Sequence, residues 1–489
     1  MMSLVDVSTY EPVIGLEVHA ELLTRSKMFC GCGVVDVTIT EPNTSVCEIC
    51  TGMPGTLPVI NRRAVEFALR VALALDCKIS TTSIFARKNY FYPDLPKGYQ
   101  ISQYESPLAK DGCLLIDTPS GKKPITIRRV HLEEDTGKLF HHTTHSLVDY
   151  NRSGVPLLEI VTEPDMASVE EVKSFATHLR SILRYLEVNS GDMEKGVIRF
   201  EANVSVRPKG SDALYTRTEI KNLNSFRTMT RAVTYEVDRQ SELLLRGDPI
   251  LQETLGWDDA NGVTIAQRSK EEAHDYRYFP EPDLPPLKVS HAWIDEIRAS
   301  LPELPHHKQS RYMDAFGLSG YAAGVISAER SIAEFFETAC EADPDLSPLK
   351  LANWISTDLF SIINESSIEI DQSQLTPQTM ADLVSLVDRG EISAPSAKII
   401  LAELFTRGGD PLSLMEELDL GIIQDADKIG ELVDQIIQEH PDQVQEYLSG
   451  KSPIFQWLLG QVMRSAGGRA DPSTVQQVLS KHLETLLKD

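Results

Sequence analysis

The stretch IGLEVHAEL, from Ile14 to Leu22, places polar side chains at every second position, with aliphatic residues between them. The polar positions are Glu17, His19 and Glu21. Because successive side chains of a β-strand point to opposite faces, an extended chain sends these three groups to one face and the aliphatic residues into a core. The pattern therefore predicts a strand whose polar face is either an ordinary solvated surface or a functional site.

Length and composition set the class of protein. At 489 residues the chain is too long for one ordinary core, so we expect two to four domains. Its hydrophobic content of 42% and charged content of 24% are typical of soluble globular proteins. The start, MMSLVDVSTYEP, lacks the regions of a signal peptide, and the most apolar helical stretch, AVEFALRVALAL, carries Glu66 and Arg70. We expect a cytoplasmic protein without a membrane span.

Net charge and cysteine content argue against two classes of protein, those that bind polyanions indiscriminately and secreted disulfide-rich proteins. A formal charge of -25 argues against a surface that binds polyanions indiscriminately, so any contact with nucleic acid must be local. The seven cysteines are an odd number, and four of them cluster near the N-terminus. This is not the pattern of a secreted disulfide framework.

The first half of the chain predicts an α+β domain built on antiparallel sheet, over residues 1–295. Two segments have helical spacing of their apolar residues, NRRAVEFALRVALAL and VEEVKSFATHLRSILRYLE. The proline-rich segment FPEPDLPPLKVS marks the exit from this domain. Strands are expected in EPVIGLEVHAEL, KPITIRRVHLEED, PLLEIVTEPD, GVIRFEANVSVRP and TRTEIKNLNSF.

The second half predicts helices only. Its amphipathic segments are separated by Pro, Gly and Asp, and TRGGDP interrupts the pattern near residues 405–411. We therefore expect an all-α helical domain over 296–408 and a helical tail domain over 409–489. The clearest helical segments are ERSIAEFFETACEA, PLKLANWISTDLFSIINE, PQTMADLVSLVDRG, SAKIILAELFTRG, ADKIGELVDQIIQEH and STVQQVLSKHLETLL.

Four cysteines have the spacing of a metal site. Cys30 and Cys32 are followed, after fourteen residues, by Cys47 and Cys50. One tetrahedral zinc ion can bind four thiolates held by two turns, and a filled coordination sphere leaves no catalytic position. We favour structural zinc, while four ordinary thiols in a cytosolic loop remain the alternative.

Acidic residues recur on the other predicted strands of the first half. If those strands line one sheet, the carboxylates converge with Glu17 and His19 into an oxygen-rich site suited to magnesium. The acids are Glu133, Glu134, Asp135, Glu159, Glu201 and Glu219.

The segment RFEANVSVR mixes acidic and basic side chains on one face. Such a face fits a pocket for a magnesium-bound phosphate ester, where metal and arginine share the charge, although a solvated face has the same pattern. The alternating residues are Arg199, Glu201, Asn203, Ser205 and Arg207. The sequence has no P-loop, no dinucleotide-binding motif, no H-E-x-x-H motif and no serine-rich amidase signature.

Several segments of the sequence resemble one protein family and occur in the same order as in that family. They are VIGLEVHAEL, GMPGTLPVINRRAVEFALR, ARKNYFYPDLPKGYQISQY, RRVHLEEDTGK, DYNRSGVPLLEIVTEPD and EIKNLNSF. They closely resemble the B subunits of the bacterial tRNA-dependent amidotransferases, which convert Glu-tRNA(Gln) to Gln-tRNA(Gln) and Asp-tRNA(Asn) to Asn-tRNA(Asn). The resemblance is dense over the first 295 residues and looser in the tail, at YLSGKSPIFQWLLGQVMRSAGGRADP.

This resemblance implies a carbon–nitrogen ligase with glutamine as amido donor. Its catalytic domain would be a glutamine-synthetase-like cradle, using ATP and Mg²⁺ to phosphorylate the side-chain carboxylate of the misacylated amino acid. Ammonia from a separate amidase subunit would then displace the phosphate, which fits the missing amidase signature. The implied assembly is a heterotrimer of this chain, the amidase and a small linker subunit.

The resemblance also implies roles for particular residues. Those implied for catalysis are Glu17, His19, Glu133, Glu134 and Glu219, and those for magnesium are Glu17, His19, Glu134, Glu159 and Glu219. From the alternation in RFEANVSVR, and not from the resemblance, we expect the nucleotide to be faced by Arg199, Glu201, Asn203, Ser205 and Arg207. Since some family members lack the four cysteines, zinc would be dispensable to the reaction.

Lys88 and Glu134 resemble a charged pair along the family's ammonia passage. The alternative for Lys88 is a surface lysine beside an aromatic cluster, Tyr90, Phe91 and Tyr92, which we expect to pack in the core.

The tail is less acidic than the rest of the chain. Residues 451–489 carry five basic side chains against three acids, a net charge of +2. By similarity to the family this segment would contact the body of the tRNA through phosphates, whereas a solvated helical bundle is the alternative. The basic residues are Lys451, Arg464, Arg469, Lys481 and Lys488.

Two other functions stay open. One is a noncatalytic tRNA-binding scaffold that has kept the fold. The other is a stand-alone carboxylate–amine ligase of the glutamine-synthetase type, active without tRNA or partners.

Overall fold

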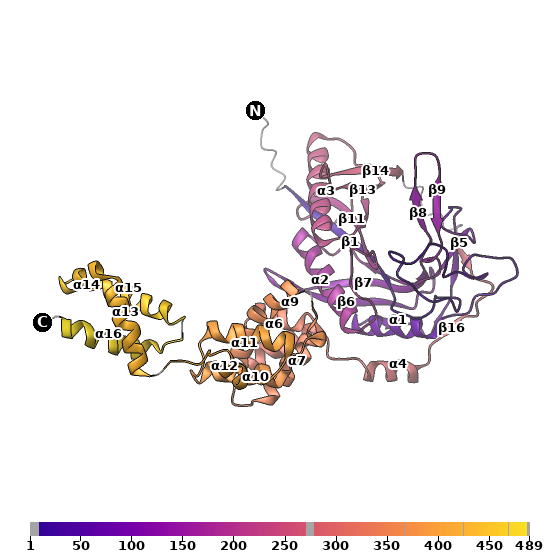
Figure 1. Cartoon of the computed structure of the whole chain (residues 1–489). Coiled ribbons are helices and arrows are strands. Elements are labelled where there is room, and N and C mark those ends of the chain that lie inside the picture. Colours follow the sequence, from indigo (N-terminus) through magenta and orange to yellow (C-terminus); the bar gives the residue numbers. More distant parts are fainter. Residues whose placement is uncertain (1–8, 270–277, 367, 424, 468, 487–489) are drawn as a thin grey trace. The chain divides into compact units, whose positions relative to one another are not determined.

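The computed structural model describes residues 9–269, 278–366, 368–423, 425–467 and 469–486. The chain divides into two compact units, Met1–Leu304 and Pro305–Asp489, which are treated separately. The expected α+β class is confirmed, because a large sheet lies in the first unit and the described part of the second is helical (Figure 1).

A nine-stranded sheet forms the centre of the first unit, with β1 as its middle strand. Neighbouring strands are antiparallel except β12 and β13, which are parallel. In order across the sheet the strands are β14 (Val263–Ser269), β13 (Glu253–Asp258), β12 (Thr218–Leu223), β11 (Ile198–Pro208), β1 (Tyr10–Glu21), β10 (Pro156–Thr162), β7 (Gly121–Glu134), β6 (Ala109–Thr118) and β2 (Lys78–Ile79).

Three smaller sheets complete the strands described in this unit. They are β15 (Tyr278–Pro280) with β4 (Ala86–Asn89) and β5 (Tyr99–Ser102), β16 (Leu287–Lys288) with β3 (Thr82–Ser83), and the hairpin of β8 (Lys138–His141) and β9 (Ser146–Asp149).

The alternation along β1 divides the sheet into an apolar and a polar face. Ile14, Leu16, Val18 and Ala20 are fully buried in the core of the first unit. Helices α1 (Arg62–Ala74), α2 (Val169–Tyr185) and α3 (Phe226–Arg246) pack against strands of the sheet and share this core, which α4 (His291–Ala299) extends. The opposite face is left for the polar side chains.

The ends of these helices follow from local sequence. The side chain of Asn61 accepts hydrogen bonds from backbone N–H groups in the first turn of α1, and Ser168 does so for α2. Both helices were expected. Helix α3 was not predicted, although Ser225 caps its start and Gly247, with φ of 80°, ends it. The segment TRTEIKNLNSF, which was predicted as a strand, ends at the first residue of this helix.

The described part of the second unit contains two hydrophobic cores, one spanning residues 312–414 and the other residues 429–483. Its helices are α5 (Pro305–Phe316), α6 (Gly320–Ser327), α7 (Arg330–Ala342), α8 (Pro348–Trp354), α9 (Phe360–Ser366), α10 (Pro377–Asp388), α11 (Ala394–Arg407), α12 (Pro411–Glu417), α13 (Ala426–Glu439), α14 (Pro441–Leu448), α15 (Pro453–Ser465) and α16 (Pro472–Leu486), with a π-helical turn at Ile355–Leu359 and a 3₁₀ turn at Ile370–Gln372.

The boundaries at 295 and 408 stay predictions, and two observations bear on them. Ile294, Ile297 and Leu304 belong to the core of the first unit, so that core extends past residue 295. Leu414 belongs to the first helical core, which reaches past residue 408.

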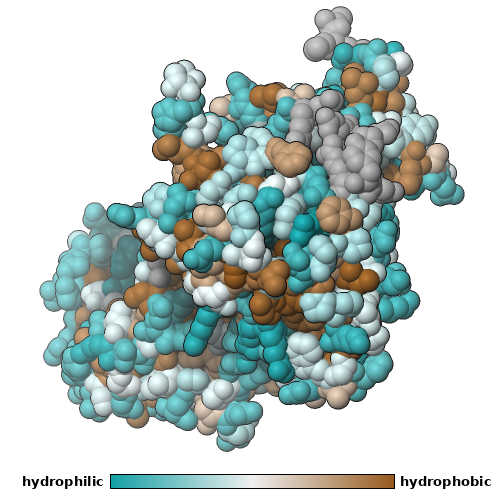
Figure 2. Space-filling model, turned by 90° about the vertical axis from the view of Figure 1, so that its right-hand side faces the viewer, coloured by the Kyte–Doolittle hydropathy of each residue, from teal (hydrophilic) through white to brown (hydrophobic). Residues whose placement is uncertain are grey.

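The described surface is of mixed polarity. Figure 2 shows one face of the molecule, on which hydrophilic and hydrophobic side chains are interspersed. None of the helices within the described ranges has both the length and the apolar character needed to cross a membrane.

Candidate active site

The polar face of the nine-stranded sheet lines an open pocket of about 900 Å³. Strands β7, β10, β1, β11 and β12 all contribute side chains to it. The register explains why, because His19 of β1 lies opposite Glu159 on one side and Arg199 on the other. The row of polar residues that the sequence shows on β1 thus continues across its neighbours.

The first cluster in the pocket, here called the histidine group, consists of His19, Glu133 and Glu159. One potential ligand atom from each lies within 4.8 Å of the others. His19 Nε2 is 3.6 Å from Glu133 Oε1 and 3.3 Å from Glu159 Oε2. A second imidazole, His131, is buried and places its Nε2 3.4 Å from Glu159 Oε2.

The charges in the histidine group affect one another's protonation. Burial opposes protonation of His19, but the hydrogen bond and charge of Glu159 outweigh it and raise the pKa of His19 to about 9. Burial, followed by repulsion from Glu159, raises the pKa of Glu133. Burial also disfavours the charge on Glu159, yet His131 and His19 hold the pKa of Glu159 well below its usual range.

The second cluster, here called the carboxylate group, consists of Glu17, Glu201 and Glu219 from three adjacent strands. One carboxylate oxygen from each lies within 4.8 Å of the others. Burial, and then repulsion from Glu159, Glu201 and Glu219, raises the pKa of Glu17. Lys221 contacts two members of the group, with its Nζ 2.7 Å from Glu201 and 3.4 Å from Glu219.

Both clusters fit a hard divalent cation. Mg²⁺ prefers carboxylate and carbonyl oxygens in a nearly octahedral arrangement. Beside the carboxylate group, the amide of Asn203 donates to Glu17 Oε1 at 2.9 Å, while its own Oδ1 is buried without a hydrogen-bond partner among the described residues. That oxygen is therefore available as a further ligand. In the histidine group His19 supplies a nitrogen, which transition metals such as Mn²⁺ also accept.

Arg199 is held in place inside the pocket by two acids. Its Nη2 donates to Asp135 Oδ2 at 2.8 Å, and its Nη1 is 3.6 Å from Glu21 Oε1. Burial raises the pKa of Asp135, but Arg152 and Arg199 outweigh it and hold that pKa below the usual range. Burial and the charge of Asp135 raise the pKa of Glu21 to about 8.

The five alternating residues of β11 do not all reach the pocket. Arg199, Glu201, Asn203 and Ser205 line it. Arg207 is absent from its lining and instead pairs with Glu11, its Nε 2.7 Å from Glu11 Oε1.

Glu134 is not brought to either cluster. Neighbouring strand residues face opposite sides, so Glu133 points into the main pocket while Glu134 lines a smaller one of about 200 Å³. There Glu134 contacts the ammonium of Lys97 and accepts a hydrogen bond from the backbone N–H of Ile101 at 2.9 Å. The expected pair of Lys88 and Glu134 is not formed, because Lys88 lines the main pocket.

The electrostatic surroundings of Lys88 come from the main pocket. Burial alone lowers the pKa of Lys88, but Tyr278, Glu133 and Glu159 outweigh it and raise that pKa. The expected core packing of the nearby aromatic cluster is wrong for two of its members, since Phe91 is 93% exposed and Tyr92 is 50% exposed.

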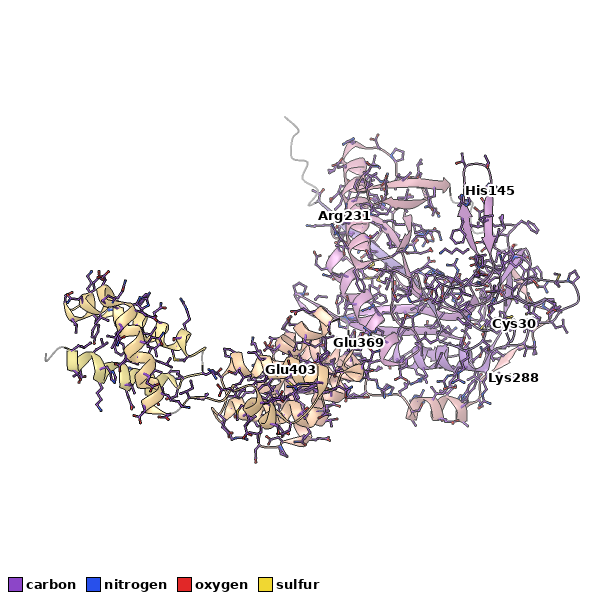
Figure 3. The ribbon with its side chains drawn as sticks, in the orientation of Figure 1. Cys30, His145, Arg231, Lys288, Glu369 and Glu403 are labelled. Carbon is purple, nitrogen blue, oxygen red and sulfur yellow. The ribbon has the colours of Figure 1, made fainter. Side chains whose placement is uncertain are left out.

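The four cysteines do come together. Their sulfur atoms lie within 4.8 Å of one another, in the long loop between β1 and α1 where Cys30 is labelled (Figure 3). A hydrogen bond from Cys30 lowers the pKa of Cys50 to about 4, with burial opposing and the charge of Lys27 assisting. Lys27 is fully buried, with Nζ 3.6 Å from Cys50 Sγ. A thiolate is the form that binds a metal, so the cluster fits a four-cysteine metal site.

The basic residues of the tail have two kinds of surroundings. Lys451 pairs with Glu446 at 3.2 Å, and Arg469 pairs with Asp419 at 3.0 Å. Arg464 and Lys481 are exposed, and the described residues offer neither an ion-pair partner. Lys488 lies outside the described residues.

Three residues of the site were missed in the sequence: His131, Lys97 and Lys221. For His131 a signal existed, because strand alternation in RRVHLEED puts it on the same face as Glu133 and opposite to Glu134. Lys97 lies within the family-like string ARKNYFYPDLPKGYQISQY, but no spacing rule links it to Glu134. For Lys221 a signal also existed, because strand alternation in TRTEIKN puts it on the same face as Glu219.

Comparison with known proteins agrees with these features. Residues 12–295 match the family model described as the GatB/GatE catalytic domain, and residues 334–483 match the model described as the GatB domain. The chain is 49% identical to the B subunit of the aspartyl/glutamyl-tRNA(Asn/Gln) amidotransferase of Thermoanaerobacter sp. (strain X514), over 97% of this chain and 99% of that one. It is 48% identical to the corresponding B subunits of Moorella thermoacetica and Thermotoga maritima, over 97% of this chain and 100% and 99% of theirs. The chain belongs to the family of aspartyl/glutamyl-tRNA(Asn/Gln) amidotransferase B subunits.

Proposed function

We propose that this chain activates and amidates the side-chain carboxylate of glutamate on tRNA(Gln), of aspartate on tRNA(Asn), or of both. In the first step the carboxylate oxygen forms a bond to the γ-phosphorus of ATP, and the bond from that phosphorus to ADP breaks. In the second step ammonia attacks the acyl carbon and inorganic phosphate leaves. The nine-stranded sheet would serve as the glutamine-synthetase-like cradle for both steps.

The observation that carries this proposal is the pair of acidic clusters on one sheet face, in a chain that belongs to this family. Two reactants that both carry negative charge, a carboxylate and a nucleotide phosphate, need positive charge between them. Mg²⁺ bound at these clusters would supply that charge and neutralise the transferred phosphoryl group.

Residue roles follow from the geometry of the pocket. Glu17, Glu201 and Glu219 would hold one ion together with Asn203, and His19, Glu133 and Glu159 would hold a second. Arg199, fixed by Asp135 and Glu21, is oriented to bind a phosphate oxygen through its guanidinium.

Ammonia would approach through the smaller pocket, which Lys97 and Glu134 line. It would reach the acyl carbon beside Lys88, which lines the main pocket. A charged pair on the way would slow bulk water while a small neutral molecule passes. A separate amidase subunit would supply the ammonia, and a small linker subunit would complete the heterotrimer.

Two further assignments belong to this proposal. Zinc at Cys30, Cys32, Cys47 and Cys50 would hold the loop between β1 and α1 without taking part in the reaction, and elemental analysis should find one zinc per chain. In the tail, the exposed Arg464 and Lys481 would contact tRNA phosphates, whereas Lys451 and Arg469 first have to leave their acidic partners.

The test omits each reactant in turn from the purified complex with Glu-tRNA(Gln), ATP and glutamine. We expect Gln-tRNA formation to need all three, and ATP consumption to depend on the tRNA. Glu159→Gln should abolish ATP consumption while tRNA binding is retained. The matched control is Glu66→Gln, whose carboxylate pairs with Arg63 on α1; neither residue lines the pocket.

Each alternative function has its own outcome in this assay. ATP consumption that ignores the tRNA would contradict the proposal and favour a stand-alone ligase. Unchanged ATP consumption in Glu159→Gln, with tRNA bound normally, would favour a noncatalytic scaffold.

A further inference from the structure

Lys221 lies where a divalent cation would bind. Its ammonium is 2.7 Å from Glu201 Oε2 and 3.4 Å from Glu219 Oε1, and these are two of the three acids in the carboxylate group. The Glu201 contact is also a direct hydrogen bond. An ammonium at this position uses carboxylate lone pairs that a metal ion needs, because Mg²⁺ binds such oxygens at about 2.0–2.1 Å.

Strand alternation places Lys221 on the pocket face, two residues after Glu219, and a β-bulge follows in β12. Phe200 of β11 pairs with Leu223, while Ala202 pairs with Ile220, so β12 contains one extra residue between these pairs. Asn222 takes a left-handed conformation there, with φ of 58°. Here the bulge redirects the next apolar side chain, so that Leu223 joins Ile220 in the core. Lys221 keeps the pocket side that alternation gives it.

The charge of the carboxylate group favours a cation beside it. Three carboxylates from adjacent strands approach one another in a partly buried site, where repulsion is strong. Asn203 donates one hydrogen bond to Glu17 but contributes no charge. Lys221 brings an ammonium into direct contact with two of the three acids.

Lys221 can leave this position more readily than the arginines of the pocket. Arg128 is fixed by a two-point contact with Glu163, and Arg199 by Asp135. Lysine has a flexible four-carbon stem and a point charge, so it can exchange partners without the fixed geometry of a guanidinium. The side chain of Lys221 is also 30% exposed and lines the pocket.

We propose that Lys221 occupies the second metal subsite in the nucleotide-free protein and moves to the phosphates when metal and nucleotide bind together. The subsite formed by Glu17, Glu201 and Glu219 then takes its cation only with the nucleotide. Metal-bound phosphate replaces the carboxylates as the partner of the ammonium. With this order of binding, the second ion does not bind to the carboxylates unless a nucleotide phosphate binds it as well. The inference rests on the proposed function, since it assigns one residue of that same site.

The test counts Mn²⁺ ions bound to the full-length chain by electron paramagnetic resonance, with and without a non-hydrolysable ATP analogue. We expect the natural chain to bind one ion without nucleotide and a second only with the analogue. Lys221→Met should bind the second ion without nucleotide, with an affinity about tenfold higher than that of any second-site binding that the natural chain shows at high Mn²⁺ concentration. It should also bind the metal–nucleotide complex at least about fivefold more weakly, because the phosphate loses a charged partner.

The chain offers a closely matched control in Lys123→Met. Lys123 pairs with Glu171 at 2.8 Å and is 31% exposed, but it lies outside the pocket lining. A variant that was merely damaged would lose metal binding, whereas a gain of binding cannot come from misfolding. Lys221→Gln should show the same gain.

Two outcomes separate this inference from the proposed function. If the second-site affinity of Lys221→Met for Mn²⁺ without nucleotide is within twofold of that of the natural chain, the inference is overturned. The proposed function is left standing by that result. Failure of the natural chain to bind any Mn²⁺ at the pocket, with or without nucleotide, would overturn both.

Discussion

The histidine group and the carboxylate group share one sheet face and both include residues of β1, yet their negative charge is balanced in different ways. In the histidine group the balancing charge is a proton on His19, whose pKa is raised to about 9. In the carboxylate group it is the ammonium of Lys221, which contacts Glu201 and Glu219. Binding of a metal must release a proton in the first case and displace a side chain in the second. Two neighbouring candidate ion sites on one sheet can therefore differ in what must happen before a metal ion binds.

The largest effect is expected from removing the imidazole of the histidine group. His19→Ala should lower ATP-dependent amidation at least about 100-fold, because a ligand of the charge-neutralising ion is lost. Its rate should be compared with that of His145→Ala, which removes an exposed imidazole at the β8–β9 hairpin (Figure 3). Phosphate release in the presence of misacylated tRNA measures the effect. Equal rates in the two variants would mean that the histidine group plays no part in the reaction.

A smaller effect is expected from the residue that supports the histidine group. His131 lies 3.4 Å from Glu159 Oε2 and is buried, so it orients a carboxylate of the group. Residues in this position typically contribute about 10–100-fold to metal affinity. His131→Gln should weaken Mn²⁺ binding in that range without changing the number of ions bound. A Mn²⁺ affinity within twofold of that of the natural chain would show that His131 does not support the histidine group.

The two groups should also differ in their response to pH. Since the pKa of His19 is raised from 6.5 to about 9 in the folded chain, its protonation stabilises the metal-free protein. This contribution is complete below pH 6.5 and is lost as pH rises through 9. Metal needs the neutral imidazole, so Mn²⁺ affinity at the histidine group should increase over the same window, by up to about tenfold per pH unit.

Titration calorimetry from pH 6.5 to 9, in buffers of different ionisation enthalpy, measures the proton released on binding. Chemical denaturation of the metal-free chain over the same range should show stability falling. In His19→Gln both trends should flatten, while an unchanged slope would show that another group titrates.

The smallest effect is expected at Arg207, which the sequence grouped with the nucleotide-facing residues. Its ion pair with Glu11 is partly exposed and lies outside the pocket lining. Such pairs contribute about 0–1 kcal/mol to stability. Arg207→Gln should leave the KM for ATP unchanged and the free energy of unfolding within about 1 kcal/mol of the natural value. A several-fold rise in that KM would return Arg207 to the nucleotide site.

Much of the first unit was predictable because strand alternation is a local property. The buried positions of β1 and the polar face that carries Glu17 and His19 followed from IGLEVHAEL alone. The α+β class and most long helices followed from apolar spacing in the same way. Helix α3 was missed because the preceding strand pattern extends to its first turn.

Which residues make up the histidine group and the carboxylate group was harder to predict from the sequence, because it depends on how the strands pair in the sheet. Pairing of Glu159 with His19 and of Asn203 with Glu219 is a long-range property of the sheet. Alternation does separate Glu133 from Glu134, but the resemblance to the family put both in one set. The face of Lys221 follows from alternation with Glu219, but its contact with Glu201 depends on the pairing of β12 with β11.

We propose that one sheet face binds two divalent cations between the amino-acid carboxylate and the nucleotide. Anomalous scattering from crystals of the full-length chain, grown with Mn²⁺ and a non-hydrolysable ATP analogue, tests it most directly. We expect one peak bounded by His19, Glu133 and Glu159 and another bounded by Glu17, Glu201 and Glu219. A map with no peak at either group, although the analogue is bound, would contradict it.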